Sequence, residues 1–209
     1  MCPFCYLGDA AFGQALNDFP HRDRVDVRHR SFLLLPDVPV GEVVGLDDHL
    51  VVQRGVRRAQ ARAANADLVE RAAALGLVLR ADRVIVARTR TAHRLLQYAA
   101  AHGRQGPMVT RLFKAYFTDG LDVSDVRVLA GLAADADLDA RAAAAVLESD
   151  AFEPELRADL RRAAELSVAG VPFFLFAGRY GVSGAQPVQV FRRALATAWD
   201  DAVVQAVTG

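Results

Sequence analysis

Cysteine, lysine and long apolar runs are all scarce in this chain of 209 residues. Two cysteines cannot hold a small secreted domain together with several bridges, which excludes a disulfide-dense scaffold. No apolar stretch approaches the roughly 18 residues of a membrane-spanning helix. The 25 basic residues, of which only Lys114 is a lysine, balance 25 acidic ones, so no global charge favours nucleic acid or an anionic membrane. We expect a globular protein without such partners.

The N-terminus also lacks the basic and apolar regions of a secretory signal peptide. With Met1 as the true start, this absence predicts a cytoplasmic protein.

Hydrophobic periodicity predicts an interrupted α/β order. Apolar residues at helical spacing predict a helix over 4–19, and alternation of apolar and polar residues predicts a strand over 25–34. Helices then follow as far as residue 168. Two strands and a last helix close the chain. The predicted later elements are helices at 46–74 with a break near Gly55, 91–102, 107–117, 125–134, 139–147 and 154–168, strands at 171–177 and 180–184, and a helix from Pro187.

The two cysteines, Cys2 and Cys5, stand at the first turn of the first predicted helix. Unpaired backbone N–H groups and the positive end of the helix dipole stabilise a thiolate there. We therefore interpret Cys2 as a nucleophile. Cys5, one turn further in, is placed to attack a mixed disulfide on Cys2 and release the substrate.

Two other roles for the CxxC motif have to be weighed. A structural zinc site needs two further ligands, and the five histidines form neither an HxxxH motif nor a second pair with suitable spacing. A passive disulfide between Cys2 and Cys5 closes too small a loop to stabilise the fold much. Both readings are weaker than redox chemistry, and we expect no metal.

Far along the chain, Gly170, Val171 and Pro172 stand at the start of a predicted strand. Proline is tolerated at a strand's first residue, and X-Pro bonds adopt the cis form at low cost. A cis bond would turn the backbone of Val171 outward, towards an extended substrate; an ordinary trans strand start is the alternative.

Several motifs together resemble the FrnE-type, DsbA-like thioredoxin-fold oxidoreductases, in a superfamily with the 2-hydroxychromene-2-carboxylate isomerases. They are CPFCYLG at 2–8, FLLLP at 32–36, TAHRL at 91–95, LFKAYFTDG at 112–120, and GVPFF at 170–174 with VSGAQP at 182–187. The resemblance implies a thioredoxin-like fold with a large all-helical insertion. The unbroken set of helices between two stretches of strand pattern gives bounds of 40–155 for the insertion and of 1–39 and 156–209 for the thioredoxin-like part. We expect the insertion to cap the cleft that holds Cys2.

Three departures from the family stand out. Phe4 replaces the usual tryptophan inside the CxxC, and Arg88 stands where an asparagine is usual. The family also has a β-strand before its CxxC, whereas only Met1 precedes Cys2 here. We therefore expect the first strand to be missing from this sequence and the native protein to begin about ten residues earlier, since an unpaired central strand position costs about 1 to 3 kcal/mol per buried group.

The resemblance assigns the candidate site. Its catalytic pair is Cys2 and Cys5, and the cis-proline loop is Val171 and Pro172. We predict further substrate contacts from Pro3, Phe4 and His93. For Phe4 and Tyr6, an apolar lip for the substrate and a core position stand as equal alternatives.

His93 has two readings. It is either a proton carrier facing the cysteines or a hydrogen-bonded anchor between the domains.

The leading hypothesis is a thiol-disulfide oxidoreductase, a dithiol oxidant or a disulfide isomerase, acting on protein or small-molecule thiols and disulfides. The alternatives are a glutathione-dependent isomerase or transferase and a non-catalytic binding module of secondary metabolism. We expect no resident cofactor, with glutathione as a candidate co-substrate. The sequence leaves the direction of the redox reaction and the oligomeric state open.

Overall fold

The computed structural model describes residues 1–35 and 44–208 and divides into two compact units. The first, called the hairpin unit below, consists of Cys2–Asp26 and Val168–Gly209. The second, the helical unit, contains Val27–Ser167. Met1 is also assigned to the helical unit, so the chain changes unit at 1/2, at 26/27 and at 167/168. The domain bounds expected from the sequence, at 39/40 and 155/156, stay a prediction.

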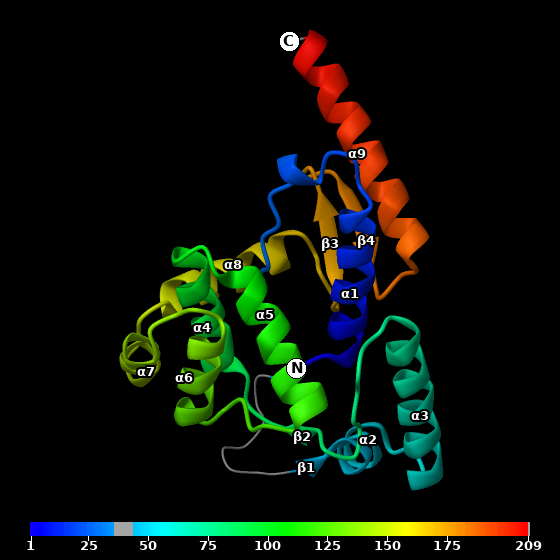
Figure 1. Cartoon of the computed structure of the whole chain (residues 1–209). Helices are drawn as coiled ribbons and strands as arrows, with labels where there is room; N and C mark the ends of the chain where they lie inside the picture. The colour runs from blue at the N-terminus through cyan, green and yellow to red at the C-terminus, as the bar shows by residue number, and fades with distance from the viewer. Residues whose placement is uncertain (36–43, 209) are drawn as a thin grey trace. The chain divides into compact units, whose positions relative to one another are not determined.

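The hairpin unit combines two long helices with one antiparallel hairpin (Figure 1). Its helices are α1 (Pro3–Asn17) and α9 (Val188–Thr208), with a short 3-10 turn, η1 (Arg22–Arg24). The hairpin joins β3 (Phe173–Phe176) to β4 (Tyr180–Ser183), and its register pairs Phe173 with Ser183. The predicted first and last helices and both C-terminal strands are thus confirmed.

Phenylalanine rings make the core of the hairpin unit. Phe12 of α1 packs against Phe174 and Phe176 of β3, with ring centroids 5.7 and 6.0 Å apart, and against Phe191 of α9 at 6.0 Å. Phe191 is fully buried and lies 4.6 Å from Phe174. Edge-to-face and tilted pairs of this kind add to the free energy of apolar burial. The cluster fixes α1, which contains Cys5 and begins directly after Cys2, to the hairpin and α9.

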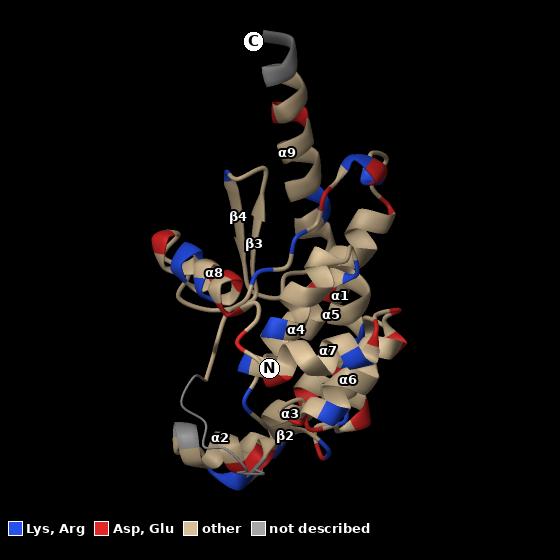
Figure 2. Cartoon of the chain, turned by 90° about the vertical axis from the view of Figure 1, so that its left-hand side faces the viewer, with Lys and Arg blue, Asp and Glu red and all other residues tan. Residues whose placement is uncertain are grey.

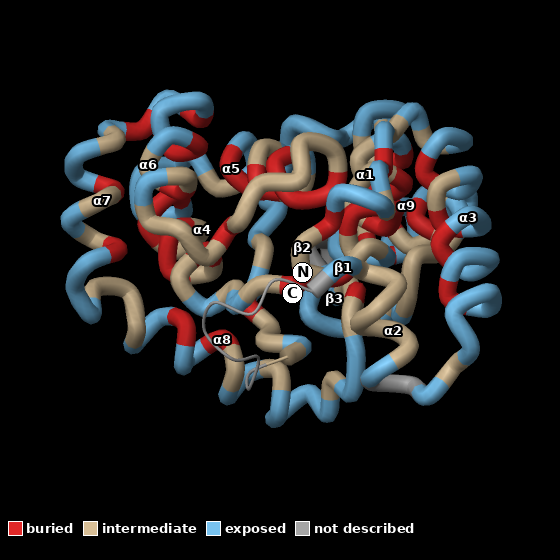
Figure 3. Tube along the Cα trace, turned by 90° about the horizontal axis from the view of Figure 1, so that it is seen from below, coloured by how far each residue is buried: buried red, intermediate tan, exposed pale blue. Residues whose placement is uncertain are grey.

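The helical unit holds the remaining helices. Its apolar core lies among α4–α8, whose largest fully buried side chains include Leu95, Leu112 and Phe117. Buried and exposed residues alternate along α6 and α7, as expected of helices that cover a core with one face (Figure 3). The elements are α2 (Leu46–Arg54), α3 (Arg58–Ala74), α4 (Arg90–Ala101), α5 (Gln105–Lys114), a π-helical turn η2 (Ala115–Asp119), α6 (Val126–Asp135), α7 (Ala140–Glu148) and α8 (Glu153–Glu165).

Local signals set the ends of these helices. The Asp125 carboxylate accepts hydrogen bonds from two backbone N–H groups at the start of α6, and Asp139 does the same for α7. These bonds lower the pKa of both carboxyls. Gly120 ends η2 with a φ of +71°, a conformation that favours glycine. The sequence prediction that capping residues and glycines delimit the helices is confirmed at these positions.

The sequence predicts an entirely helical middle of the chain, and this prediction is wrong. Two-residue strands β1 (Val44–Gly45) and β2 (Ile85–Val86) form a short antiparallel pair. Neither segment is long enough to show the alternation on which a strand prediction rests.

The strand predicted over 25–34 is wrong. Within the described parts of the chain, no neighbouring strand pairs with this segment, and side chains bind its backbone instead. The Gln105 side-chain amide donates to the carbonyl oxygen of His29 at 2.9 Å and accepts from its N–H at 3.0 Å. The buried carboxylate of Asp159 accepts from the N–H of Ser31 at 2.8 Å. The backbone of this segment finds its bonding partners in helix side chains.

Charged residues of both signs are interspersed along the chain, and α8 alone carries several of each (Figure 2). No helix among the described residues is long and apolar enough to cross a membrane.

Candidate active site

Cys2 is the N-cap residue of α1. Its backbone is extended, with φ −106° and ψ 121°, and Pro3 takes the first helical position, where a missing N–H costs nothing. The Cys2 carbonyl oxygen accepts the first backbone bond of the helix, from the N–H of Cys5 at 3.0 Å. Because no side chain caps the helix, its first N–H groups are available to the Cys2 sulfur.

The environment of Cys2 favours its thiolate. A hydrogen bond from the Cys5 thiol, aided by the backbone N–H groups of Cys5 and Phe4, lowers the pKa of Cys2 to about 7, although burial acts in the opposite direction. About half of the Cys2 side chains would then be ionised near neutral pH. A thiolate is the form of cysteine that attacks disulfides.

Cys5 has the opposite electrostatics. The pKa of Cys5 lies well above its ordinary value for three reasons. The Cys5 thiol donates a hydrogen bond to the Cys2 sulfur, the side chain is shielded from water, and the neighbouring thiolate is negatively charged. Both cysteines are free thiols, and Cys5 is half-buried. The pair therefore consists of one acidic thiol and one that keeps its proton until the neighbouring sulfur loses its charge.

The loop before β3 lies against the cysteines. The Val171–Pro172 peptide bond is cis. The protonated Cys2 thiol donates to the carbonyl oxygen of Val171 over 3.5 Å. The next carbonyl, of buried Pro172, accepts from the N–H of Gly184 at 2.8 Å, which ties the loop to the end of the hairpin. Residues 169 positions apart in the sequence thus meet at one sulfur atom.

Gly8 is the residue of this site that the sequence reasoning missed. A Cβ atom at Gly8 would lie 3.0 Å from Cγ of Pro172 and 3.3 Å from Cζ of Phe174. Only glycine lets α1 and the proline loop approach this closely. The signal was present in the sequence, since Gly8 is a glycine on the apolar face of the predicted helix, three positions after Cys5.

The other predicted residues of the hairpin unit have different surroundings. Phe4, inside the CxxC, is 43% exposed, which leaves an apolar ring in solvent beside the cysteine pair. Pro3 and Val171 are half-buried. Tyr6 is buried, which agrees with the core alternative for this residue and not with a substrate lip.

His93 belongs to the helical unit, on α4. Its Nδ1 atom is buried and has no hydrogen-bond partner among the described residues. Burial lowers the pKa of His93 to about 4, so the ring is neutral near pH 7. Its predicted role towards the cysteines stays a prediction.

Within residues 1–35 and 44–208, no three histidine, cysteine or carboxylate side chains gather as a metal site would require. The chemistry that the described site offers is that of two thiols.

An acidic thiol at the start of a helix, a second thiol one turn later, and a proline loop at a hairpin define a thioredoxin-like thiol site. The model of the DSBA-like thioredoxin domain family matches residues 1–196, and the chain belongs to that family.

Solved structures and a curated protein are similar to this chain, among them the following three. The structure of a probable DsbA oxidoreductase from Streptomyces coelicolor is 42% identical with a TM-score of 0.91, and the match covers 95% of this chain and 86% of that one. A 2-hydroxychromene-2-carboxylate isomerase, 17% identical with a TM-score of 0.69, covers 98% and 94% and shares the fold. The uncharacterized protein YwbO of Bacillus subtilis is 26% identical over 197 residues, 93% of this chain and 91% of its own length.

Proposed function

We propose that this protein is a thiol-disulfide oxidoreductase whose nucleophile is Cys2 and whose resolving thiol is Cys5. The observation that carries the proposal is geometric: the two thiols stand at the first turn of α1, and the Cys2 thiol donates to the Val171 carbonyl oxygen beside the cis Val171–Pro172 bond. Membership of the DSBA-like family and the 42% identity to a probable DsbA oxidoreductase support it.

In the reducing direction, the Cys2 thiolate attacks one sulfur of a substrate disulfide and expels the other as a thiolate. A mixed disulfide between Cys2 and the substrate results. Loss of the Cys2 charge removes the main reason for Cys5 to keep its proton. Cys5 then gives that proton to the substrate thiolate expelled first, attacks the Cys2 sulfur and expels the second substrate thiolate. Two electrons have moved to the substrate, and a Cys2–Cys5 disulfide remains.

The oxidising direction is the same sequence reversed, with a substrate dithiol as the electron donor. After a turn in the reducing direction, two equivalents of glutathione would return the Cys2–Cys5 disulfide to the dithiol and leave glutathione disulfide. We propose glutathione as this co-substrate and a cytoplasmic setting for the reaction.

The substrate contacts that we propose surround the Cys2 sulfur. Phe4 offers an exposed apolar ring, and Pro3 and Pro172 border the cysteine pair. When Cys2 is ionised it no longer donates to the Val171 carbonyl, which is then free to accept an N–H from an extended substrate. His93 stays in the proposal as a contact from the helical unit.

The test is the turnover of a peptide disulfide by the wild-type protein and two variants. Cys2→Ser should lose turnover entirely. Cys5→Ser should complete one attack and accumulate a mixed disulfide on Cys2, visible as an added mass that a reductant removes. Because the chain has only two cysteines, no third thiol can resolve this intermediate.

The rival functions give different results in the same experiment. Neither a glutathione-dependent isomerase without dithiol chemistry nor a non-catalytic module would turn over the peptide disulfide. The isomerase would act instead on its own substrate with glutathione and would keep that activity in Cys5→Ser. Either outcome would contradict the proposal.

A further inference from the structure

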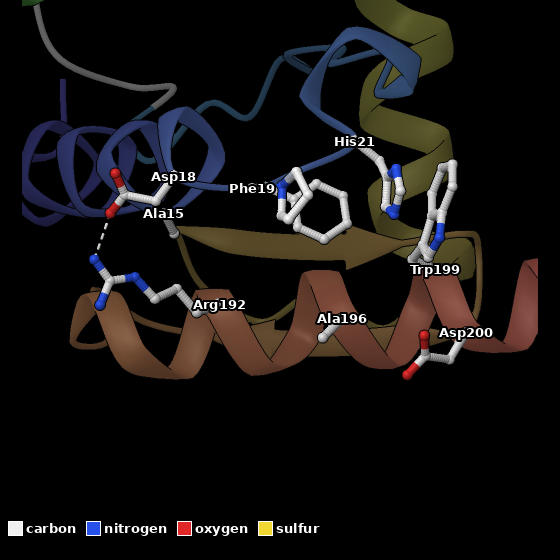
Figure 4. A pocket seen from close by; sticks show the side chains of 9 residues that line it. Ala15, Asp18, Phe19, His21, Arg192, Ala196, Trp199 and Asp200 are labelled. Carbon is white, nitrogen blue, oxygen red and sulfur yellow. Dashed lines mark hydrogen bonds and ion pairs between the residues drawn. The ribbon is translucent and has the colours of Figure 1, made fainter.

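A hollow of about 330 Å³ lies in the hairpin unit, between the end of α1 and the side of α9 (Figure 4). It lies away from the thiols, because α1 has 15 residues and a helix rises about 1.5 Å per residue, which separates its two ends by about 22 Å. The thiol chemistry proposed above does not involve this hollow.

Aromatic rings form one wall of the hollow. The His21 ring stacks on Trp199 with centroids 4.0 Å apart and planes 12° from parallel, and Phe19 meets Trp199 edge-on at 6.1 Å. These rings come from the segment after α1 and from α9, and they brace each other. The wall is therefore already formed without a ligand, which lowers the entropic cost of binding a flat molecule.

Small residues make the space. Ala15 of α1 and Ala196 of α9 both line the hollow. A longer side chain at Ala196 would extend across the space next to the rings. A single aromatic ring with a short chain is well below 330 Å³ in volume, so the hollow has room for one.

One negative charge around the hollow lacks a positive partner. Asp18 and Arg192 are joined by an ion pair at one end, drawn as a dashed line in Figure 4. Asp200 also lines the hollow and has no ion-pair or hydrogen-bond partner among the residues that the structure describes. The pair cancels itself, and the carboxylate of Asp200 leaves a net negative charge that favours a cationic ligand.

We propose that this hollow is a binding site for a small aromatic amine. The ring packs over Ala15 and Ala196 beside Trp199, and the ammonium group lies near Asp200. A cation close to the indole face gains further from the ring quadrupole.

The protein carries its own reporter, because Trp199 is its only tryptophan. The experiment titrates the full chain with phenethylamine and follows tryptophan fluorescence, with 2-phenylethanol and 3-phenylpropionate as neutral and anionic comparisons. Phenethylamine should give a saturable change. The alcohol should bind up to about fivefold more weakly, the range of an exposed ion pair, and the acid should not saturate.

Matched variants separate the two contributions. Asp200→Asn should weaken phenethylamine up to about fivefold and leave the alcohol unchanged. Asp23→Asn, at an exposed carboxylate outside the hollow, is its control. Ala196→Leu should abolish saturation, whereas Ala202→Leu, at an exposed position of the same helix, should not. Unchanged melting temperatures would show that each variant folds.

The proposal is overturned if phenethylamine gives no saturable signal, if it binds Ala196→Leu as tightly as wild type, or if the carboxylic acid binds better than the amine. Saturating amine should leave the alkylation rate of Cys2 unchanged, so this result is independent of the test of the thiol pair.

Discussion

The Cys2 thiol donates a hydrogen bond to the carbonyl oxygen of Val171, across 169 positions of sequence and 3.5 Å of space. The bond exists only while Cys2 is protonated. In the ionised state the sulfur instead accepts hydrogen bonds from the Cys5 thiol and from backbone N–H groups. Ionisation of one sulfur thus changes both its own partners and the bonding of the loop beside it.

Removing the Cys5 thiol should raise the pKa of Cys2. Its hydrogen bond is the largest cause that lowers this pKa, so the value should rise from about 7 towards 9 in Cys5→Ala. Cys5→Ser, which keeps a hydroxyl donor, should lie between the two. Thiolate absorbance in the ultraviolet, followed against pH, measures all three. Equal values in Cys5→Ala and wild type would show that the helix N-terminus alone activates Cys2.

Two glycines of α1 should respond in opposite ways to alanine. Nothing lies within 4 Å of a Cβ at Gly13, so Gly13→Ala should stabilise the protein by roughly 1 kcal/mol through helix propensity. A Cβ at Gly8 would press on Pro172, so overpacking in Gly8→Ala should cancel the gain from helix propensity and lower the free energy of unfolding by about a further 1 kcal/mol. Gly8→Ala should also lose disulfide turnover. Urea unfolding of the two variants is the measurement. A Gly8→Ala protein as stable as Gly13→Ala would contradict the close approach.

The buried carboxylate of Asp159 should stabilise the helical unit. It is 3% exposed and accepts from the Ser31 N–H, the Gln97 side-chain amide at 2.6 Å, and the Arg30 guanidinium at 3.0 Å. Asp159→Asn places an amide among these donors and should cost about 1 to 3 kcal/mol.

Hydrogen exchange should show, residue by residue, that side chains hold the backbone of the segment that contains His29 and Ser31. The Ser31 amide should lose protection in Asp159→Asn, and the His29 amide in Gln105→Ala. Asp67→Asn, at an exposed ion pair on α3, should change stability by only a few tenths of a kcal/mol. Unchanged protection at Ser31 would mean that the carboxylate does not hold this segment.

Acid should destabilise the protein through His93. Burial lowers the pKa of His93 in the folded state to about 4, below the value of about 6.5 in an unfolded chain. Between these values the unfolded state binds the extra proton, so the free energy of unfolding should fall as pH falls from about 6.5 to 4.

His93→Asn should flatten this slope. Urea unfolding at several pH values decides the question. An unchanged slope in His93→Asn would assign the acid sensitivity to other groups.

The sequence predicted those features that depend on local rules. Apolar spacing predicted α1, Asp125 and Asp139 marked the starts of two helices, and Gly120 marked an end. The segment 25–34 failed because a strand needs a neighbour. An alternating pattern does not tell whether the neighbour is another strand or, as for His29, a glutamine side chain.

The candidate site divides in the same way. Cys2 and Cys5 are three residues apart, so helix geometry alone relates them. The contact between Gly8 and Pro172 joins two ends of the chain, and one sequence does not specify such a pair before the fold is known.

The most direct test of the account is the order in which the two thiols react. The reduced protein is alkylated with limiting iodoacetamide across a pH series, and fragmentation of the N-terminal peptide assigns each label. Cys2 should react first, with a rate that rises through a midpoint near pH 7, while Cys5 stays unmodified. Labelling of Cys5 first, or equal labelling of both, would contradict the assignment of Cys2 as the nucleophile.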